Sequence, residues 1–237
     1  MHEESLEATA TDLAPVSRVV KSRRTNLLID QSRAVDDGLV ADLLELIRWA
    51  PNHKRTWPWQ VAVFTGDSRV VLGEACATDG LASGITDHAK LTKIRGKYNR
   101  APVVIAVGQI GYSGAEYSGA TDQTIDASTG FVSTQDAPRK DTRRVDARRV
   151  DARRVDTHRV GEDRDAVAAG IQNFLLGATA AGLASYWGSA TDPVGPALLG
   201  LCGFASTSRV NALIYLGWPA SNQEPPARSE LPITWHR

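Results

Sequence analysis

The 237-residue sequence contains few cysteines and no excess of either charge. Cys76 and Cys202 stand alone, without CxxC spacing, which argues against a zinc site and against a disulfide framework. Lys plus Arg and Asp plus Glu both number 27, so the formal net charge is zero. A balanced chain has no overall field that attracts nucleic acid or an anionic membrane. The composition therefore argues against a nucleic-acid partner.

Long apolar runs are also absent, so we expect no transmembrane helix and no membrane partner. The first residues, MHEESLEATATDLAP, are acidic and polar, whereas a secretory signal is basic and then apolar. Unpaired cysteines fit a reducing compartment. We therefore expect a cytoplasmic globular protein.

The short motifs of several enzyme classes are missing, namely GxSxG, GxxxxGK[ST] and HExxH. VGQIGYSG does not have the spacing of a GxGxxG dinucleotide loop, and the five histidines form no i,i+4 pair. We therefore predict no metal and no catalytic constellation of side chains. If the chain is an enzyme, a bound organic cofactor supplies the reactivity.

Hydrophobic periodicity predicts an α+β fold with a central sheet surrounded by helices. Residues 1–15 are predicted to be a flexible tail and residues 16–237 a single domain. The clearest helix begins after Asp36 or Asp37 as its N-cap and ends at Pro51. The other predicted elements are a helix at 16–24, a helix after the first strand, and strands at 60–64, 100–108, 183–189 and 209–220.

A second long helix, Ala166 to Ala181, is rich in small and apolar residues. Asp163 or Asp165 is its predicted cap, and Gly182 its predicted C-terminal stop. Because most of its faces are apolar, we expect it to run through the core or along a subunit interface.

A polar insertion is predicted at about 111–160. It includes the tandem repeat RRVDA RRVDA RRVDT HRV, from Arg143 to Val160. A five-residue step turns about 140° around a helix, so the valines form no continuous stripe. We interpret the repeat as a solvated loop or an exposed helix. The alternative is a nucleic-acid or partner-binding arm, against which the interspersed aspartates argue because they repel phosphates.

The first candidate binding segment is RRT, Arg23 to Thr25. Two guanidinium groups and a hydroxyl suit a phosphate, since arginine binds phosphate in a bidentate manner. The alternative is a basic helix C-terminus that is stabilised by the helix dipole.

Two further segments carry donors beside aromatic rings. In WAPNHKRTWPW, residues 49–59, two prolines stiffen a loop that presents His53, Lys54 and Arg55. The alternative is a helix-to-strand connection with its tryptophans in the core. In YWGSAT, residues 186–191, Gly-Ser after an aromatic residue lets backbone N–H groups approach a phosphate or a ring edge. Its alternative is a turn at the end of a strand.

Together, these segments resemble the nitroreductase family of flavin enzymes. The family begins with an Arg-Arg-Ser-like cluster, which RRT matches. Its APxxxxxQPW segment, which leads into a strand, matches APNHKRTWPWQVAVF, with Trp57 in the usual glutamine position. RAPVVIAV, IQNFLLGATAAGLASYWGS and ALIYLGWPA match later family segments, so the resemblance covers about 16–235 apart from the insertion.

The resemblance implies a mainly antiparallel sheet, an intertwined homodimer, and FMN sites that both chains form. Arg23 and Thr25 would hold the FMN phosphate and ribityl chain, with Arg24 adjacent. His53 would face the flavin, and Trp49 can reach the flavin of the partner subunit.

Trp187–Ser189 matches a flavin-binding Trp-Arg-Ser segment of the family, with Gly188 in place of the arginine. Leu27 stands where many members have a lysine. Both departures remove a cation that would stabilise reduced flavin, and Lys54 or Arg55 can replace it.

The activity that the resemblance implies is reduction of nitroaromatics, quinones or similar electron-poor acceptors. NADH or NADPH would donate hydride to FMN in a ping-pong reaction. One alternative is another flavin reaction, such as reductive dehalogenation. The other is a flavin-binding or partner-binding protein without this activity, in which the Arg/Asp repeat is the interaction arm.

Overall fold

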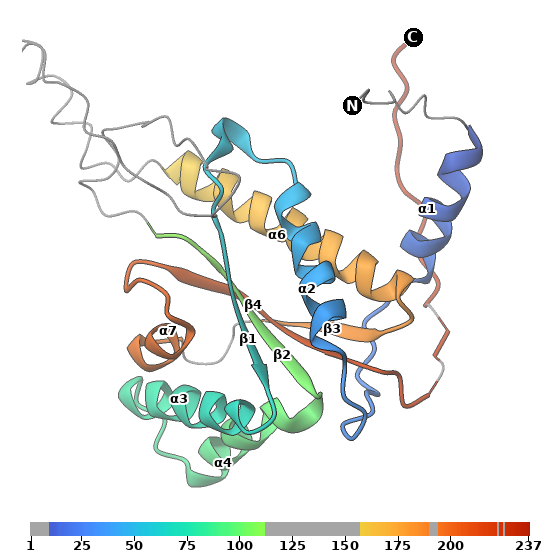
Figure 1. The fold of residues 1–237 in the computed structure, drawn as a ribbon. Helices are drawn as coiled ribbons and strands as arrows, with labels where there is room; N and C mark the ends of the chain where they lie inside the picture. Colours follow the sequence, from blue (N-terminus) through green and yellow to red (C-terminus); the bar gives the residue numbers. More distant parts are fainter. Residues whose placement is uncertain (1–9, 112–156, 190–193, 222, 225) are drawn as a thin grey trace, which may run out of the picture.

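The protein has three layers, with a four-stranded antiparallel sheet between two layers of helices (Figure 1). The computed structural model describes residues 10–111, 157–189, 194–221, 223–224 and 226–237. The predicted α+β class and antiparallel sheet are confirmed.

All four predicted strands are present, in the order β1-β2-β4-β3, and each pair is antiparallel. The edge strand β3 therefore pairs on one side only, with β4. The strands are β1 (Trp59–Thr65), β2 (Val103–Gln109), β3 (Ala184–Ser189) and β4 (Arg209–Gly217).

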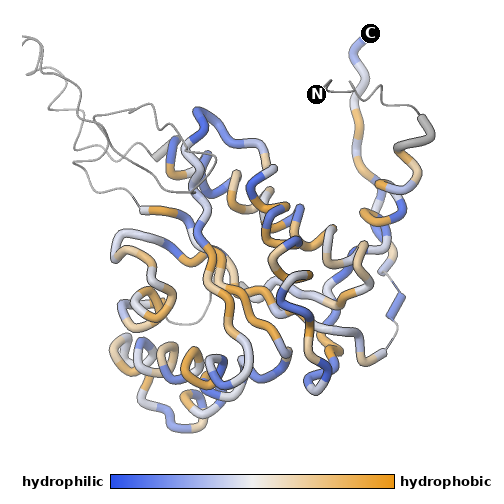
Figure 2. The backbone as a smooth tube through the Cα atoms, viewed as in Figure 1, coloured by the Kyte–Doolittle hydropathy of each residue, from blue (hydrophilic) through white to orange (hydrophobic). Residues whose placement is uncertain are grey.

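Strand β2 is buried along its whole length, as its unbroken apolar run predicts. Val103, Ile105 and Val107 pack into the cluster on one face of the sheet, and Val104 and Ala106 into the cluster on the other. Figure 2 shows the apolar colour concentrated along the central strands. The sheet has two buried faces because helices cover both of them.

One face is covered by α2 (Asp37–Glu45), the 3-10 helix η1 (Leu46–Trp49) and α6 (Thr157–Ala180). The side chain of Asp36 accepts a hydrogen bond from Leu39 N at 3.0 Å. Asp36 rather than Asp37 is therefore the N-cap of α2.

Helix α6 begins at Thr157 and not at Ala166, so neither Asp163 nor Asp165 is its cap. The prediction was wrong because the polar repeat concealed the first turns of the helix. Gly182 follows the helix with φ of 76°, as predicted for its stop. Residues 112–156, with most of the predicted insertion and repeat, lie outside the described residues.

The other face is covered by helices, and two of its α-helices were not predicted from the sequence. Helix α4 buries only two side chains, Leu91 and Ile94, and α7 is seven residues long, so neither has a clear apolar period. The helices of this layer are α3 (Ser68–Ala82), α4 (His88–Gly96), the 3-10 helix η3 (Lys97–Arg100) and α7 (Pro196–Cys202).

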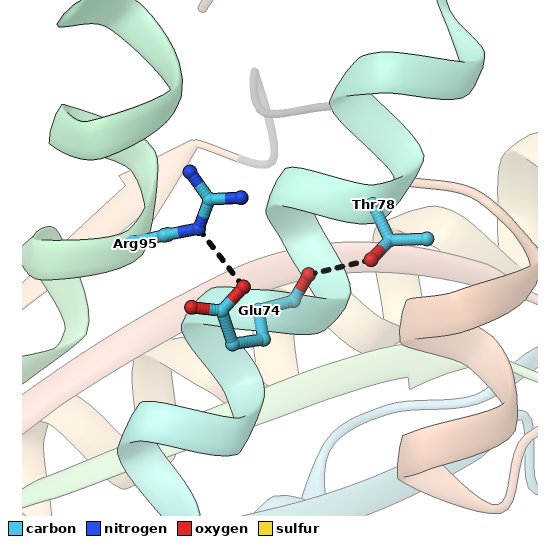
Figure 3. Close-up of polar contacts among 3 residues, drawn as sticks. All are labelled: Glu74, Thr78 and Arg95. Carbon is cyan, nitrogen blue, oxygen red and sulfur yellow. Dashed lines mark hydrogen bonds and ion pairs between the residues drawn. The ribbon is translucent and has the colours of Figure 1, made fainter. Parts of the chain in front are cut away.

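Helices α3 and α4 approach closely at Gly73, where an added Cβ would lie 2.3 Å from the carbonyl oxygen of Arg95. Beside this contact, Arg95 Nε donates to Glu74 Oε2 at 2.9 Å, and Thr78 Oγ1 donates to the Glu74 carbonyl (Figure 3). The ion pair is exposed to solvent, and such pairs contribute about 0–1 kcal/mol. The absence of a side chain at Gly73 is what allows the two helices to meet.

Helix α1 (Ala10–Ser22) lies beside the C-terminal half of α6 (Figure 1). It begins at Ala10 and contains Pro15, so residues 10–15 are helical and do not belong to a flexible tail. The prediction failed because these residues are mostly polar or small and include a proline, so they carry little apolar periodicity. Residues 1–9 lie outside the described residues.

The described part of the C-terminal segment after Ala220 has no helix or strand, as its proline content predicts. It runs along the side of the molecule that carries α1 (Figure 1). Its apolar side chains are exposed, including Leu231 and Trp235, at 78% and 74%.

Candidate functional site

The basic cluster Arg23–Thr25 directly follows α1, whose last turn ends with a hydrogen bond from Arg23 N to Val19 O. Both arginines are partly buried, and Thr25 is exposed. Arg24 Nη1 donates to Ser22 O at 3.1 Å, while its Nε is buried and has no hydrogen-bond partner within the described part of the chain. Among the described residues, neither guanidinium group pairs with a carboxylate. The contact of Arg24 with Ser22 O is that of a basic group at a helix C-terminus, and no carboxylate of the described residues neutralises either guanidinium group.

The chain then passes alongside the start of strand β3. Asn26 N donates to Ser185 O at 3.1 Å, and the buried Asn26 side chain accepts from Leu28 N. This contact places the basic cluster beside the edge strand that carries Trp187. The structure thus brings together two of the segments singled out in the sequence, although they lie far apart along the chain.

On β3, Trp187 is 39% exposed and Gly188 pairs with Leu213. A Cβ on Gly188 would lie 3.0 Å from Leu213 O and 3.1 Å from the ring of Tyr215. Gly188, at the position where the family has an arginine, therefore packs so closely against β4 that a larger side chain would require its neighbours to move. Ser189 closes the strand, and its side chain lies outside the described part of the molecule.

On β3, Tyr186 precedes Trp187 and belongs to a stack of tyrosines. Its ring lies 4.4 Å from that of Tyr215, which in turn stacks on Tyr98 at 6.3 Å. Burial raises the pKa of Tyr186, and the hydrogen-bonded Arg100 acts in the opposite direction. The stack fixes β3 from the side of α3 and α4. Sequence spacing did not indicate it, because its members come from three separate elements.

Asp79 on α3 anchors the segment of chain that follows β3. Its buried carboxylate accepts hydrogen bonds from the backbone N–H groups of Gly195, Ala197 and Leu198, at 2.8–3.0 Å. These groups form the N-terminus of α7. Asp79 therefore fixes the place where the chain resumes after the undescribed residues 190–193. The sequence contains no signal for this contact, because an aspartate inside a predicted helix is ordinarily exposed.

The third segment, residues 49–59, leads from η1 into β1. Trp49 is 76% exposed, and His53 begins the 3-10 helix η2 (His53–Arg55). Lys54, Arg55 and Trp57 have φ of 56°, 51° and 48°. They are the only residues other than glycine with positive φ in the described part of the chain. Each such conformation costs about 1–3 kcal/mol, so tertiary contacts must hold this turn.

Within one chain, His53 lies far from the basic cluster. The turn contacts the N-terminal half of α6 through Asp163 and Ala166, whereas α1 lies beside Leu176 and Ala180. At 1.5 Å per residue, Asp163 and Ala180 are about 25 Å apart along the helix. The structure therefore does not bring all of the predicted FMN-binding residues together in one chain.

An apolar groove of about 420 Å³ lies between α1, η1 and α6. Trp49 lines it together with residues of α1, including the exposed Val16 and Val20. Leu27, at the position of the missing lysine, is also exposed, at 63%. This side of the molecule thus has an uncovered apolar surface beside the basic cluster.

Metal-binding and membrane-spanning features are absent from the part of the chain that the structure describes. Its histidine, cysteine and acidic side chains nowhere form a group of three or more that could hold a metal ion. No helix there is both long and apolar enough to cross a bilayer. Cys76 and Cys202 are free thiols, and burial raises the pKa of Cys202 to about 12.

Solved structures share this architecture at low sequence identity. A nitroreductase-like protein from Bacillus cereus superposes with a TM-score of 0.62 at 20% identity, covering 97% of this chain and 95% of that chain. A nitroreductase with bound FMN from Bacteroides fragilis superposes with a TM-score of 0.60 at 18% identity, covering 94% and 98%. An iodotyrosine deiodinase bound to FMN and 3-iodo-L-tyrosine superposes with a TM-score of 0.56 at 13% identity, covering 94% and 99%. These likenesses define the fold class.

Sequence comparison leads to the same class. The model of the nitroreductase family matches residues 20–218, and the chain belongs to this family. No curated protein matches the chain in sequence. Membership supports a flavin-dependent oxidoreductase.

Proposed function

We propose that the protein is a cytoplasmic, homodimeric FMN-dependent oxidoreductase. It uses NADH or NADPH to reduce nitroaromatic, quinone or similar electron-poor acceptors by a ping-pong mechanism. One observation carries the proposal: Arg23 and Arg24, which form no ion pair with any described residue, lie beside an edge strand with the partly exposed ring of Trp187.

The basic cluster fits the phosphate of FMN. Arg24 Nε is a buried guanidinium donor without an acceptor among the described residues. A bound anion would supply that acceptor. Arg23 would supply the second cation and Thr25 a neutral hydroxyl. Trp187, Gly188 and Ser189 would line the ring side. When bound, FMN supplies the redox chemistry, accepting hydride and passing electrons to the acceptor.

Trp49 and His53 would belong to the site of the partner subunit. This arrangement is supported by the distance of His53 from the basic cluster within one chain and by the apolar surface beside Trp49. An uncovered patch of this kind commonly marks an interface. The protein's own contribution is to hold the ring, exclude water from it and admit the acceptor. No acidic or basic side chain is assigned a catalytic role.

Bound flavin provides the first test of this proposal. Purified protein is expected to be yellow and to release FMN on denaturation, at close to one FMN per chain, because each dimer would contain two sites. Flavin absorbance and chromatography of the released cofactor measure the stoichiometry. Colourless protein that takes up no added FMN would contradict the proposal.

Arg23→Ala is expected to weaken FMN binding by about 10- to 100-fold. A charge-assisted hydrogen bond contributes about 1.5–3 kcal/mol, and 1.4 kcal/mol corresponds to tenfold. Titration of apoprotein with FMN gives the dissociation constants. The matched control is Arg18→Ala, which removes an exposed arginine of α1 and should leave the affinity unchanged. Equal affinities for the Arg23 variant and the wild type would refute the phosphate assignment.

A further inference from the structure

The strained turn at residues 52–57 is held by a network that reaches into α6. Asn52 Nδ2 donates to Thr56 Oγ1 at 2.9 Å, and Asn52 Oδ1 accepts from Trp57 N at 2.9 Å. Thr56 Oγ1 donates in turn to Asp163 Oδ1, across 107 residues of sequence. Asp163 is 1% exposed, and its other oxygen, Oδ2, accepts no hydrogen bond from any residue that the structure describes. Burying a carboxylate with an unsatisfied oxygen is costly, so other tertiary contacts must offset that cost.

A second anchor lies about one helical turn further along α6. The ring of Trp57 packs against that of Trp59 at 5.9 Å, and Trp59 Nε1 donates to Ala166 O at 3.1 Å. Both anchors act on the same short turn, so its left-handed residues have little freedom to relax. Such strain is typical of ligand-binding turns, whose geometry is set before the ligand arrives.

The turn carries two cations and, two residues later in the sequence, an aromatic side chain. Lys54 and Arg55 are exposed, as is about half of Trp57. Among the residues that the structure describes, neither cation forms an ion pair. Arginine and lysine next to a flat apolar surface suit a ligand that combines an aromatic ring with a carboxylate.

We propose that this turn selects electron acceptors that carry a carboxylate on the aromatic ring. Lys54 and Arg55 bind the carboxylate and Trp57 contacts the ring. Asn52, Thr56 and Asp163 are positioning residues that hold the turn. This inference rests on the proposed function, because it requires His53 and its neighbours to face the flavin site.

The test compares two acceptors of the same size, 4-nitrobenzoate and the neutral 4-nitrobenzyl alcohol, on FMN-loaded protein. In Lys54→Gln/Arg55→Gln, kcat/KM for 4-nitrobenzoate is expected to fall about tenfold or more, because the charge-assisted hydrogen bonds to the carboxylate are lost. For the alcohol it should change less than twofold. The matched control is Lys90→Gln/Lys93→Gln on α4, in the helical layer across the sheet, which should affect neither acceptor. An equal fall for both acceptors would assign the cations to the flavin and overturn the proposal.

Binding gives a second readout that needs no turnover. Calorimetric titration of oxidised protein with 4-nitrobenzoate, without reductant, should show a dissociation constant about tenfold higher in the double variant. Thr56→Val should weaken 4-nitrobenzoate binding in the same direction, and Thr56→Ser, which keeps the hydroxyl, should restore it. Wild-type affinity in both the double variant and Thr56→Val would overturn the proposal.

Flavin content per chain separates this inference from the proposed function. Wild-type protein that contains no FMN and takes none up contradicts the proposed function. If the flavin-loaded variants discriminate between the two acceptors as the wild type does, only the proposal that this turn selects carboxylates is contradicted. A variant that changes only the KM for NADPH relative to NADH also contradicts it, since the cations would then bind the nucleotide phosphate.

Discussion

Replacing Asp79 by alanine is expected to lower the free energy of unfolding by about 3 kcal/mol or more. The carboxylate is 4% exposed and accepts three backbone hydrogen bonds at the N-terminus of α7. Alanine leaves those N–H groups unsatisfied, and each buried unsatisfied group costs about 1–3 kcal/mol. Water entering the space left by the side chain offsets part of this cost. Urea denaturation measures the change.

Two further variants make this result specific. Asp79→Asn keeps an acceptor oxygen and most of the volume, so its loss of stability should be smaller than that of alanine. Asp67→Ala removes an exposed carboxylate at the N-cap position of α3, where it makes no capping hydrogen bond, and it should change stability by less than about 1 kcal/mol. A loss below about 1 kcal/mol for Asp79→Ala would show that this anchor contributes little.

The second large effect is expected for Gly73→Val, with a loss of about 3 kcal/mol. A Cβ at this position meets the backbone of Arg95 at 2.3 Å, and backbone cannot rotate away as a side chain can. Overpacking of a well-packed contact costs about 1–3 kcal/mol, and a clash with main chain belongs at the upper end. Helices α3 and α4 must separate, which also loosens the packing of Tyr98 against Tyr215 of β4. Thermal and urea unfolding measure the loss.

The controls compare sterics with charge at the same helix pair. Gly96→Val adds the same side chain at the end of α4, where a Cβ meets nothing within 4 Å, so stability should change by less than about 1 kcal/mol. Glu74→Gln breaks the exposed pair with Arg95 and should cost about 0–1 kcal/mol. If Glu74→Gln cost more than Gly73→Val, the ion pair would be what joins the two helices.

Periodicity predicted the elements that have a strong local pattern. The strands were found because β2 is apolar on both faces, and α2 because Asp36 caps a helix with a regular apolar stripe. Helices α4 and α7 were missed because each is short and buries few side chains. The start of α6 was missed because its first turns are polar and follow a charged repeat. In each case burial leaves a local signal only where several apolar residues recur.

The candidate site shows the same division. The residue types in Arg23–Thr25 and in residues 49–59 are sufficient to indicate two binding segments. Their partners were not predictable: Asn26 meets Ser185, and Thr56 meets Asp163, across long stretches of sequence. Asp163 was one of two aspartates predicted to cap the helix, because an aspartate that precedes an apolar run commonly caps a helix N-terminus. Its burial against Thr56 could not be read from this local pattern.

The sequence by itself determined the family of this protein, the four strands and the two basic segments, because these depend on residue type and on short spacing. Only the tertiary structure decided that Arg23 and Arg24 lie beside β3, whereas His53 lies toward the other end of α6. It alone revealed the strained turn and the anchors at Asp79 and Asp163. The physical reason is that a hydrogen bond between distant segments leaves no periodic trace in either segment.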